Sequence, residues 1–334
     1  MAEEHLTDRP LVAVVGGDSL LAREVRELLG ESKPAPRVEL ISATADGSTT
    51  LGAEDEEPVV MAPLAPESLE GARVAFLAGS AASSRRTLKV NPENGPVLID
   101  LTAALEEQPQ ARLRAPLAEP HGVSAAAKIQ VIAHPAAIAI AMVAARLGEL
   151  ATVRRMIVHV FEPASELGQK GLDELQQQTV GVLSFQKLQT DVFDAQLAFN
   201  MLARYGEEAL EPLELVEQRI ERHLASLLAA YPAVPMPSLR LIQAPVFHGL
   251  SFSVWVEFEE NPGAGAIGHA LEHGGMDVRR DDPPNNVGAA GQNGVSVGAI
   301  FADPNHARAC WLWMVADNLR LAAENALAVA KESL

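Results

Sequence analysis

The stretch LVAVVGGDSLLAREVRELL, residues 11–29, decides the fold. Its first part, Leu11–Gly16, is short, valine-rich and continuously apolar, which is typical of a buried parallel strand. Two glycines end this run, and apolar residues then recur at helical spacing up to Leu29, where Gly30 is placed to cap the helix. A strand, a glycine turn and a helix in this order predict the first unit of a doubly wound α/β sheet.

Four more strands are predicted in the N-terminal part of the chain. They are short apolar runs at Val38–Ser42, Val59–Leu64, Ala72–Ala78 and Val97–Leu101. Strands and helices alternate to about residue 125. We therefore expect a Rossmann-like, doubly wound α/β domain with helices on both faces of a parallel sheet.

The pattern changes after about residue 128. Helices are predicted over Ala136–Leu147, Gly171–Gln178, Leu213–Ala229 and Cys310–Lys331. Strands are predicted at Gln130–Ala133, Arg154–Phe161, Leu239–Pro245, Gly249–Glu259 and Val295–Phe301, with Leu239–Pro245 and Gly249–Glu259 antiparallel, and a loop at Asp281–Gly294. We expect a first domain of residues 1–128, completed by a C-terminal helix over residues 308–334 that packs back on it, and an α+β domain over residues 129–307.

Composition and charge bound the class of protein. The 334 residues suffice for two domains, and 48% hydrophobic with 21% charged residues is typical of a globular chain rather than a disordered or fibrous one. The chain has 44 acidic and 26 basic residues, a formal net charge of −18. Because such a surface repels phosphate backbones and anionic lipids, neither nucleic acid nor a membrane surface is an expected partner.

No export or membrane signal is predicted. The N-terminal MAEEHLTDRP lacks the basic and apolar regions of a secretory signal, and the most apolar run, Ala136–Ala145, is about half of a membrane span. The one cysteine, Cys310, excludes an intrachain disulfide and fits a reducing compartment. We expect a soluble, cytoplasmic protein.

The glycine turn has two interpretations. Gly16-Gly17-Asp18-Ser19 lies where a dinucleotide phosphate would meet the N-terminus of a helix. The turn departs from G-x-G-x-x-G, because Ser19 and Ala22 stand at the second and third glycine positions and Asp18 adds a negative charge. The alternative is an ordinary strand-to-helix turn in which Asp18 or Ser19 caps the helix.

Three other features also have a chemical and a structural interpretation. His269 and His273 share a face of a predicted helix, but no third zinc ligand follows at a suitable spacing, so an exposed helix end is favoured and no metal is predicted. Cys310 is flanked by tryptophans at the start of a predicted helix, which favours a buried thiol over a reactive one. The glycine loop Leu167–Gly171 either approaches a cofactor or partner strand, or forms a plain turn.

Several segments, taken in order, resemble one family. They are LVAVVGGDSLLAREVRELL (11–29), Ala78-Gly79-Ser80, VLIDLTAAL (97–105), IAHPAAIAIAMVAARL (132–147), Ser165–Leu175, Leu197–Asn200, APVFHGLSFSVWVEF (244–258), VGAIFADP (297–304) and DNLR (317–320). The chain resembles the aspartate-semialdehyde dehydrogenases over almost its whole length, and among them a group of divergent paralogues, the Usg-type proteins. The resemblance implies a homodimer formed through the second domain, which is then a dimerisation and substrate-type domain.

The resemblance also implies a chemistry and the positions that carry it. The family uses a cysteine nucleophile, a histidine acid/base, NADP, and arginines that hold carboxylate and phosphate. In the matching segments the nucleophile position is Ala137 and the histidine position is Leu250. Two arginine positions are Gln243 and Glu106, the latter a charge reversal, and the glutamine that orients the thiol is replaced by Glu162. No catalytic residue is expected, because a methyl group cannot attack a carbonyl and a leucine cannot move a proton.

The cofactor implied by the resemblance is NAD or NADP. The positions that would contact it are Gly16, Gly17, Asp18, Ser19, Ser42, Gly79, Ser80, Gly168 and Asn318. The altered glycine turn counts against the usual pyrophosphate pose. The lack of an arginine after Ser42 counts against recognition of a 2′-phosphate.

A few polar residues near the lost positions could act as substitutes. His248 lies two residues before Leu250 and would point to the same side of a regular strand, where it could act as a base. Ser165 and Ser251 lie in the same region by the resemblance, and a serine–His248 hydrolase is the chemistry that they would support. His134 replaces the asparagine of the nucleophile segment and could be a polar wall residue.

Three hypotheses follow for the function. The first is a non-catalytic homologue with the dehydrogenase fold, acting as a homodimer or paired with an active paralogue. The second is an oxidoreductase of altered substrate that reduces an aldehyde or oxo group with NAD(P). The third is a dinucleotide or metabolite sensor.

Overall fold

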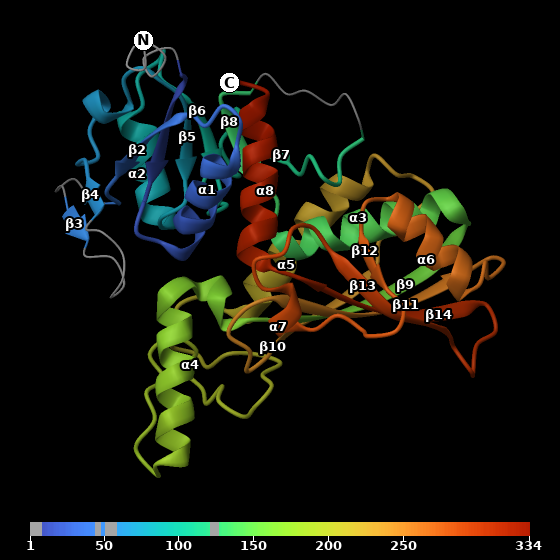
Figure 1. The fold of residues 1–334 in the computed structure, drawn as a ribbon. Coiled ribbons are helices and arrows are strands. Elements are labelled where there is room, and N and C mark those ends of the chain that lie inside the picture. Colours follow the sequence, from blue (N-terminus) through green and yellow to red (C-terminus); the bar gives the residue numbers. More distant parts are fainter. Residues whose placement is uncertain (1–8, 44–47, 51–58, 121–126) are drawn as a thin grey trace. The chain divides into compact units, whose positions relative to one another are not determined.

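Residues 9–43, 48–50, 59–120 and 127–334 are the part of the chain that the computed structural model describes (Figure 1). Residues 1–8, which belong to the stretch without a predicted secretory signal, lie outside the described residues. The chain divides into two units, one of residues 1–133 and 322–334 and one of residues 134–321. Among the helices of the described part, none is long and apolar enough to cross a membrane.

A six-stranded parallel sheet forms the first unit, in the order β2-β1-β5-β6-β8-β7. Its strands are β1 (Leu11–Val15), β2 (Arg37–Ile41), β5 (Ala72–Leu77), β6 (Val97–Asp100), β7 (Ala111–Arg114) and β8 (Ile129–Ile132). The connections include α1 (Leu20–Glu31), α2 (Ala81–Val90), the 3-10 turn η1 (Pro66–Leu69), and the antiparallel pair of β3 (Ser48–Thr50) and β4 (Val59–Met61). The Rossmann-like, doubly wound domain is confirmed.

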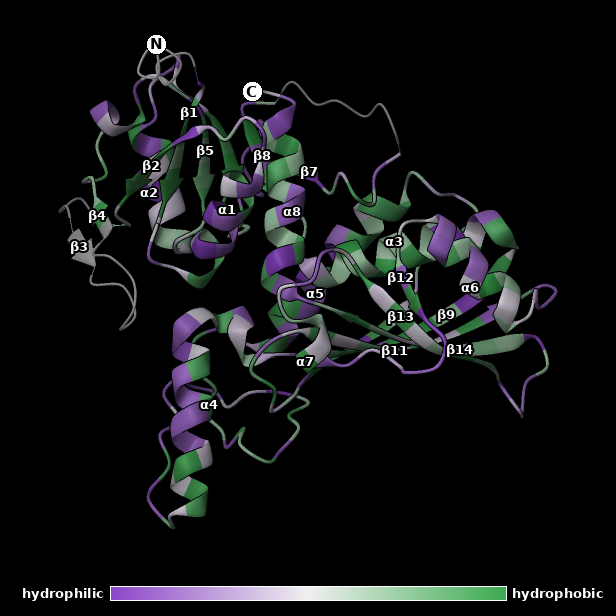
Figure 2. Ribbon diagram, in the orientation of Figure 1, coloured by the Kyte–Doolittle hydropathy of each residue, from purple (hydrophilic) through white to green (hydrophobic). Residues whose placement is uncertain are grey.

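Burial explains why the central strands have near-continuous apolar sequences. The side chains of residues 12–15 in β1 and 74–77 in β5 are fully buried, and Figure 2 colours β5 and β8 towards the hydrophobic end of the scale. A parallel sheet is covered on both faces, so successive side chains that point to opposite sides are both removed from water. The alternation expected of a half-exposed strand is therefore absent from these runs.

The predicted helix cap at Gly30 is wrong, because α1 continues through this residue to Glu31. The cap is Ser32, whose N–H donates to the carbonyl of Leu29 at 3.3 Å and whose Oγ donates to the carbonyl of Leu28 at 3.1 Å. Two donors on one residue satisfy the last carbonyls, so the helix does not need a left-handed glycine to end.

The second unit is built on a mixed six-stranded sheet, in the order β10-β9-β11-β14-β13-β12. Its strands are β9 (Val153–Glu162), β10 (Ser238–Gln243), β11 (Leu250–Phe258), β12 (Asp277–Arg279), β13 (Ser296–Ala302) and β14 (Ala309–Ala316). Its helices are α3 (Pro135–Leu150), α4 (Gly168–Leu183), α5 (Leu213–Leu228), α6 (Ala264–His273), the single turn α7 (Asn286–Ala289) within the predicted loop, and the 3-10 turn η2 (Ala164–Leu167). The α+β character of this part is as predicted.

The strands predicted at Leu239–Pro245 and Gly249–Glu259 run in opposite directions within one sheet, as predicted. The two strands are not neighbours, because β9 lies between them, parallel to β10 and antiparallel to β11. The connection between them crosses the end of β9 to reach its other side.

The predicted helix over Cys310–Lys331 is wrong in its first part. Residues Ala309–Ala316 form β14, and only Asn318–Lys331 form the last helix, α8. Cys310, Leu312 and Met314 are buried, whereas Trp311 and Trp313 are half-buried on the other face. Since both faces carry apolar side chains, periodicity alone could not separate a strand from a helix here.

One face of the mixed sheet is covered by α3, α5 and α6 (Figure 1). The opposite face carries an apolar row that crosses four strands: Ile157 of β9 pairs with Trp255, which pairs with Trp311, which pairs with Phe301. Ile157 is 40% exposed and Phe301 is 53% exposed. We call this row with Trp313 the open apolar face, and it contains all three tryptophans of the chain.

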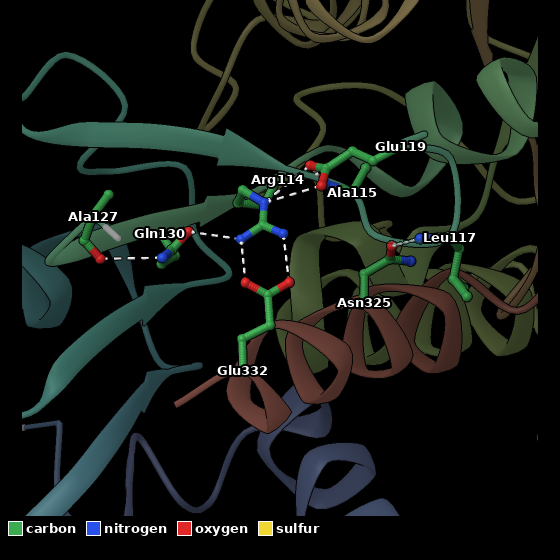
Figure 3. Close-up of polar contacts among 8 residues, drawn as sticks. All are labelled: Arg114, Ala115, Leu117, Glu119, Ala127, Gln130, Asn325 and Glu332. Carbon is green, nitrogen blue, oxygen red and sulfur yellow. Dashed lines mark hydrogen bonds and ion pairs between the residues drawn. The ribbon is translucent and has the colours of Figure 1, made fainter. Parts of the chain in front are cut away.

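The last helix packs back on the first unit, as predicted, since residues 322–334 belong to that unit. A buried arginine fastens it there (Figure 3). Arg114, at the end of β7 and 1% exposed, donates to both carboxylate oxygens of Glu332, at 2.7 and 3.0 Å, and to those of Glu119, each at 3.1 Å. It also donates to Gln130 Oε1 at 3.2 Å. Burial opposes the charge, but hydrogen bonds to Glu332 and Glu119 keep the pKa of Arg114 above its ordinary value.

We expect Glu332→Ala to lower the free energy of unfolding by about 1–3 kcal/mol, because it leaves a buried guanidinium with unsatisfied donors. Urea unfolding followed by far-UV circular dichroism measures this loss. Lys331→Ala is the matched control, since Lys331 is exposed on the same turn and should change little. Equal stability of the two variants would contradict the role given to Arg114.

Candidate functional site

The turn after β1 is held by close backbone contacts. Gly16 has a φ of +79°, and a β-carbon at this position would lie 2.3 Å from the Cα of Gly79. Ser19 caps α1, because its Oγ accepts from the N–H of Ala22 at 3.0 Å and donates to the carbonyl of Ala78 at 2.7 Å. The two glycines thus let two turns approach each other, and Ser19 joins them.

Most donors at this turn are used inside the chain. The N–H groups of Gly16 and Gly17 donate to the carbonyl of Ile41 at 2.9 and 3.4 Å, and that of Ser19 donates to Gly16 at 3.0 Å. Asp18 is exposed and places a carboxylate at the turn. A pyrophosphate at a helix N-terminus needs free N–H donors and is repelled by a carboxylate. The turn therefore does not fit a dinucleotide phosphate in the usual pose.

Ser42, Gly79 and Ser80 lie at the same edge of the parallel sheet as this turn. Ser80 caps α2 in a reciprocal pair: its Oγ accepts from the N–H of Ser83 at 3.2 Å, while Ser83 Oγ accepts from the N–H of Ser80 at 2.8 Å. Ser42 is buried and its N–H donates to the carbonyl of Ala62 at 2.8 Å. The structure thus brings most of the predicted cofactor positions together, and the hydrogen bonds of Ser42 and Ser80 described here are made within the protein itself.

The positions implied for catalysis gather at one edge of the mixed sheet. Glu162 ends β9 and Gln243 ends the parallel strand β10, where the two residues are register partners. Leu250 begins β11, which runs antiparallel to β9, and so lies at the same edge. Ala137 lies in the first turn of α3, the helix that packs on β9.

Apolar side chains occupy the two positions that the resemblance implies for the nucleophile and the acid/base. Ala137 and Leu250 are both 0% exposed. Gln243 is also fully buried, and its carboxamide is used by its neighbours: Nε2 donates to the carbonyls of Glu162 and Ala244 at 2.8 and 3.0 Å, and Oε1 accepts from the hydroxyl of Tyr205 at 2.5 Å. These three side chains offer neither a nucleophile, nor a proton carrier, nor a cation for an anionic substrate.

Two carboxylates mark this edge. Glu162 is 1% exposed, and Glu166 of η2 has a side chain 17% exposed. Burial raises the pKa of Glu162 well above its ordinary range, and the nearby carboxylates of Glu166 and Glu211 raise it further. Burial also raises the pKa of Glu166 to about 7, although Asn318 and Arg219 act to lower it. Glu162 Oε2 and Glu166 Oε1 find no hydrogen-bond partner among the described residues.

The histidines of this region are structural. His134 caps α3, since its Nδ1 accepts from the N–H of Ala136 at 3.2 Å, and its own N–H donates to Nδ1 of His223 at 2.9 Å. Burial lowers the pKa of His134 well below its ordinary value, and the charges of His223 and Arg219 lower it further. His134 is therefore a neutral imidazole near neutral pH, with Nε2 3.8 Å from Glu166 Oε2.

One cation faces these carboxylates from the helix α5. Arg219 forms a close ion pair with Glu211, and it acts electrostatically on both Glu162 and Glu166. Because its guanidinium is already paired with Glu211, it compensates the other two carboxylates only in part.

Asn318, at the start of α8, organises the loops beside this edge. Its Oδ1 accepts from the hydroxyl of Ser165 at 3.1 Å and from the N–H of Gly249 at 3.2 Å. Ser251 donates instead to Asn286 Oδ1 at 2.9 Å. The hydroxyls of Ser165 and Ser251 are thus occupied by amide oxygens, which leaves the suggested serine–His248 pairing without support in this geometry.

The placement predicted for His248 is wrong. It lies before β11, in a bend, and Gly249 with a φ of +86° separates it from Leu250. Side chains two residues apart point to the same side only in a regular strand. His248 is half-buried and does not take the position of Leu250.

The remaining predicted residues lie apart from this edge or have structural contacts. Gly168, with a φ of +65°, ends η2. Glu106 is half-buried after β6 in the first unit. Cys310 is buried, as expected, but on β14, where its thiol donates to Asn261 Oδ1 at 3.3 Å and burial raises its pKa. His269 and His273 lie on α6, and the described residues contain no group of three or more His, Cys, Asp or Glu arranged to hold a metal.

Several residues of this site were missed from the sequence. Glu166, Glu211, Arg219, His223 and Tyr205 come from η2, a loop and α5. The one signal in the sequence is the spacing of Glu162 and Glu166 in FEPASE, between an apolar strand and a glycine loop. Charged residues near a turn are normally solvated, so only the fold shows that Glu166, Glu211 and Arg219 are half-buried.

Known proteins similar to this chain support a family assignment. The dimerisation domain of the semialdehyde dehydrogenases matches residues 145–321. A USG-1 protein homolog of Azotobacter vinelandii is 29% identical over 332 residues, covering 96% of each chain. The aspartate-semialdehyde dehydrogenase of Rickettsia bellii is 25% identical over 342 residues, covering 98% of each chain.

Solved structures that are similar to this chain support the same assignment. A probable aspartate-semialdehyde dehydrogenase from Pseudomonas aeruginosa superposes with a TM-score of 0.83 at 28% identity, over 97% of this chain and 98% of that one. The aspartate-semialdehyde dehydrogenase with NADP from Candida albicans superposes with a TM-score of 0.69 at 14% identity, over 97% of this chain and 98% of that one, a likeness of fold alone.

We expect Glu166→Gln to stabilise the protein above pH 7. The folded-state pKa of Glu166, about 7, exceeds its ordinary 4.5, so folding favours the protonated acid and wild-type stability falls as the pH rises from about 4.5 to about 7. The groups that face Glu166 are Glu162, His134, Arg219, Asp317 and Asn318. Gln keeps the shape without the charge, so the variant should gain up to about 3 kcal/mol at pH 8 and little at pH 4.5.

Urea unfolding of wild type and variant between pH 4.5 and pH 8 measures this difference. Glu207→Gln serves as the control, because Glu207 is exposed. A gain that is the same at every pH, or absent at pH 8, would show that Glu166 is not a buried carboxylate with poor compensation.

Proposed function

Because the chain belongs to the semialdehyde dehydrogenase family, we propose that it is a dimeric homologue of aspartate-semialdehyde dehydrogenase without the NADP-dependent phosphorylating dehydrogenase activity. The observation that carries this proposal is the packing of Ala137 and Leu250 at the positions that the resemblance assigns to the nucleophile and the acid/base. Both side chains are fully buried hydrocarbon. The family reaction needs a covalent thioester and a proton transfer, and these two groups can supply neither.

The charges around the site support the same proposal. An arginine that would bind the substrate carboxylate is replaced by Gln243, whose carboxamide bonds to Glu162, Ala244 and Tyr205. Above pH 7 Glu166, whose pKa burial raises to about 7, adds negative charge where the resemblance implies that anions bind. An anionic acyl substrate and inorganic phosphate would both be repelled there.

The first unit supports the absence of NADP binding in the family pose. Gly16, Gly17 and Ser19 use their N–H groups within the chain, and exposed Asp18 carries a charge of the same sign as the pyrophosphate. When bound, the cofactor would supply hydride acceptance. Because Ser19 and Ser80 already cap α1 and α2 within the chain, these turns offer few groups that could bind the cofactor.

The two alternative functions have less support. An oxidoreductase of altered substrate needs a proton donor in place of Leu250, and His248 lies outside the strand. A metabolite sensor requires no catalytic group and is compatible with the polar cluster that remains. Binding without catalysis is therefore the second candidate.

We expect no NADPH formation from L-aspartate semialdehyde, NADP and phosphate above the rate without protein. Removal of the nucleophile and the acid/base together lowers such rates by about 10⁴-fold or more. The aspartate-semialdehyde dehydrogenase of Rickettsia bellii, assayed in parallel, is the positive control. Turnover that His248→Ala abolishes would instead favour the oxidoreductase of altered substrate.

The open apolar face supports a homodimer through the second unit. Ile157, Trp255, Trp311 and Phe301 form a continuous row across the sheet, and the family's matching domain is a dimerisation domain. Large apolar side chains aligned on one sheet face are typical of a permanent interface. A second copy of this chain is the occupant we propose, and an active paralogue would pair through the same face.

We expect Ile157→Arg to weaken the dimer, because an arginine at this end of the row would be buried in the interface without a partner at a cost of about 3 kcal/mol or more. Sedimentation velocity should give twice the chain mass of 35.5 kDa for wild type and a concentration-dependent shift to monomer for the variant. The control is Val60→Arg, at a residue 75% exposed in the first unit. A wild-type monomer, or equal behaviour of the two variants, would contradict this interface.

A further inference from the structure

The open apolar face carries a carboxylate that is bonded to two of its tryptophans. Asp303 follows β13, and its Oδ2 accepts from the indole N–H of Trp255 at 2.7 Å and from that of Trp311 at 3.2 Å. Its Oδ1 accepts from the backbone N–H of Asn305 at 2.8 Å. The bond from Asn305, and then those from the two indoles, hold the pKa of Asp303 below its ordinary value. At neutral pH Asp303 is therefore an anion that joins two indole rings.

All three indole N–H groups of the open apolar face are satisfied within the chain. Trp313 donates to the carbonyl of Pro284 at 3.0 Å, and its ring centroid lies 6.0 Å from that of Phe161. A tryptophan that becomes buried usually needs a hydrogen-bond partner for its N–H. Because these N–H groups already have partners, an apolar surface can cover the three rings without leaving a donor unsatisfied.

The row across this face is complementary to a second copy of itself. From β9 to β13 the order is Ile157, Trp255, Trp311 and Phe301, with the tryptophans in the middle and one large apolar side chain at each end. A two-fold axis pairs a surface with itself, so an axis between β11 and β14 would lay the row of one copy on that of the other. The matched dimerisation domain, residues 145–321, contains the whole row. A second copy is the occupant that fits this face.

We propose that Asp303 is the positioning residue of this interface: it fixes Trp255 and Trp311 as a preformed pair against which the same pair of a second copy packs. The ring orientations are set before association, so less side-chain freedom is lost when the two copies meet. Aromatic anchors of this kind contribute a large share of the binding free energy in protein interfaces. This inference rests on the homodimer of the proposed function and assigns the residue that makes it tight.

Sedimentation velocity with fluorescence detection, over a dilution series of the full chain, measures the dimer dissociation constant. We expect Asp303→Ala to raise this constant by about tenfold or more, because two indole donors would be buried in the interface without an acceptor. Asp303→Asn keeps a carboxamide oxygen for both indoles and should stay within about threefold of wild type. Glu70→Ala removes an exposed carboxylate from the first unit and controls for the change of charge.

A second comparison separates the positioning of the rings from a structural role in the turn at Asn305. In a chain with Trp255→Phe and Trp311→Phe, the rings remain aromatic but have no N–H that needs an acceptor. Adding Asp303→Ala to that chain should change the dissociation constant by less than about threefold. A role in the turn alone would give the same loss with tryptophan and with phenylalanine. Far-UV circular dichroism and melting curves check that each variant is folded.

The outcomes distinguish this inference from the proposed function. If Ile157→Arg dissociates the dimer while Asp303→Ala has the dissociation constant of wild type, or if the loss is equal with tryptophan and with phenylalanine, this inference is overturned and the homodimer stands. A wild-type monomer overturns the homodimer and this inference together. Turnover in the dehydrogenase assay overturns the proposed lack of activity and leaves the role of Asp303 standing.

Discussion

The buried guanidinium of Arg114 is the interaction on which the rest of the architecture depends. Its partners Glu119 and Glu332 lie 5 and 218 residues further along the chain. A charge that is 1% exposed is tolerated only when its donors are satisfied, so the first unit is complete only when the C-terminal residues return to it. The helix that brings Glu332 back is also the one that begins with Asn318.

Under the proposed function, the site keeps its packing without the family's chemistry. Buried positions tolerate apolar replacement when volume and pattern are kept, and Ala137 and Leu250 would be such replacements. The polar residues around them did not become apolar as well. Gln243 is fully satisfied by backbone carbonyls and Tyr205, whereas Glu162 and Glu166 retain oxygens without partners among the described residues. A structure that only preserved packing would have little reason to keep these carboxylates buried, because each one lowers stability near neutral pH.

The sequence predicted some features correctly because a local rule governs them. The run at Leu11 to Val15 is a parallel strand because both of its faces are buried, and the capping role offered for Ser19 needs only the next turn of helix. Predictions failed where the conformation of one segment depends on its contacts with another segment. Cys310 lies on a strand because β11 and β13 flank it. His248 misses the site because Gly249 adopts a left-handed conformation to meet Asn318.

The sequence by itself determined the two-part α/β organisation, the family, and the apolar side chains at positions 137 and 250. These depend on hydrophobic pattern and on the identity of single residues, which are properties of the linear chain. Only the tertiary structure decided that Glu162, Glu166 and Asn318 meet as buried groups, and that the tryptophans share one open sheet face. The physical reason is that burial and strand register come from neighbours distant in sequence. Whether a carboxylate is solvated or unpaired depends on these distant neighbours alone.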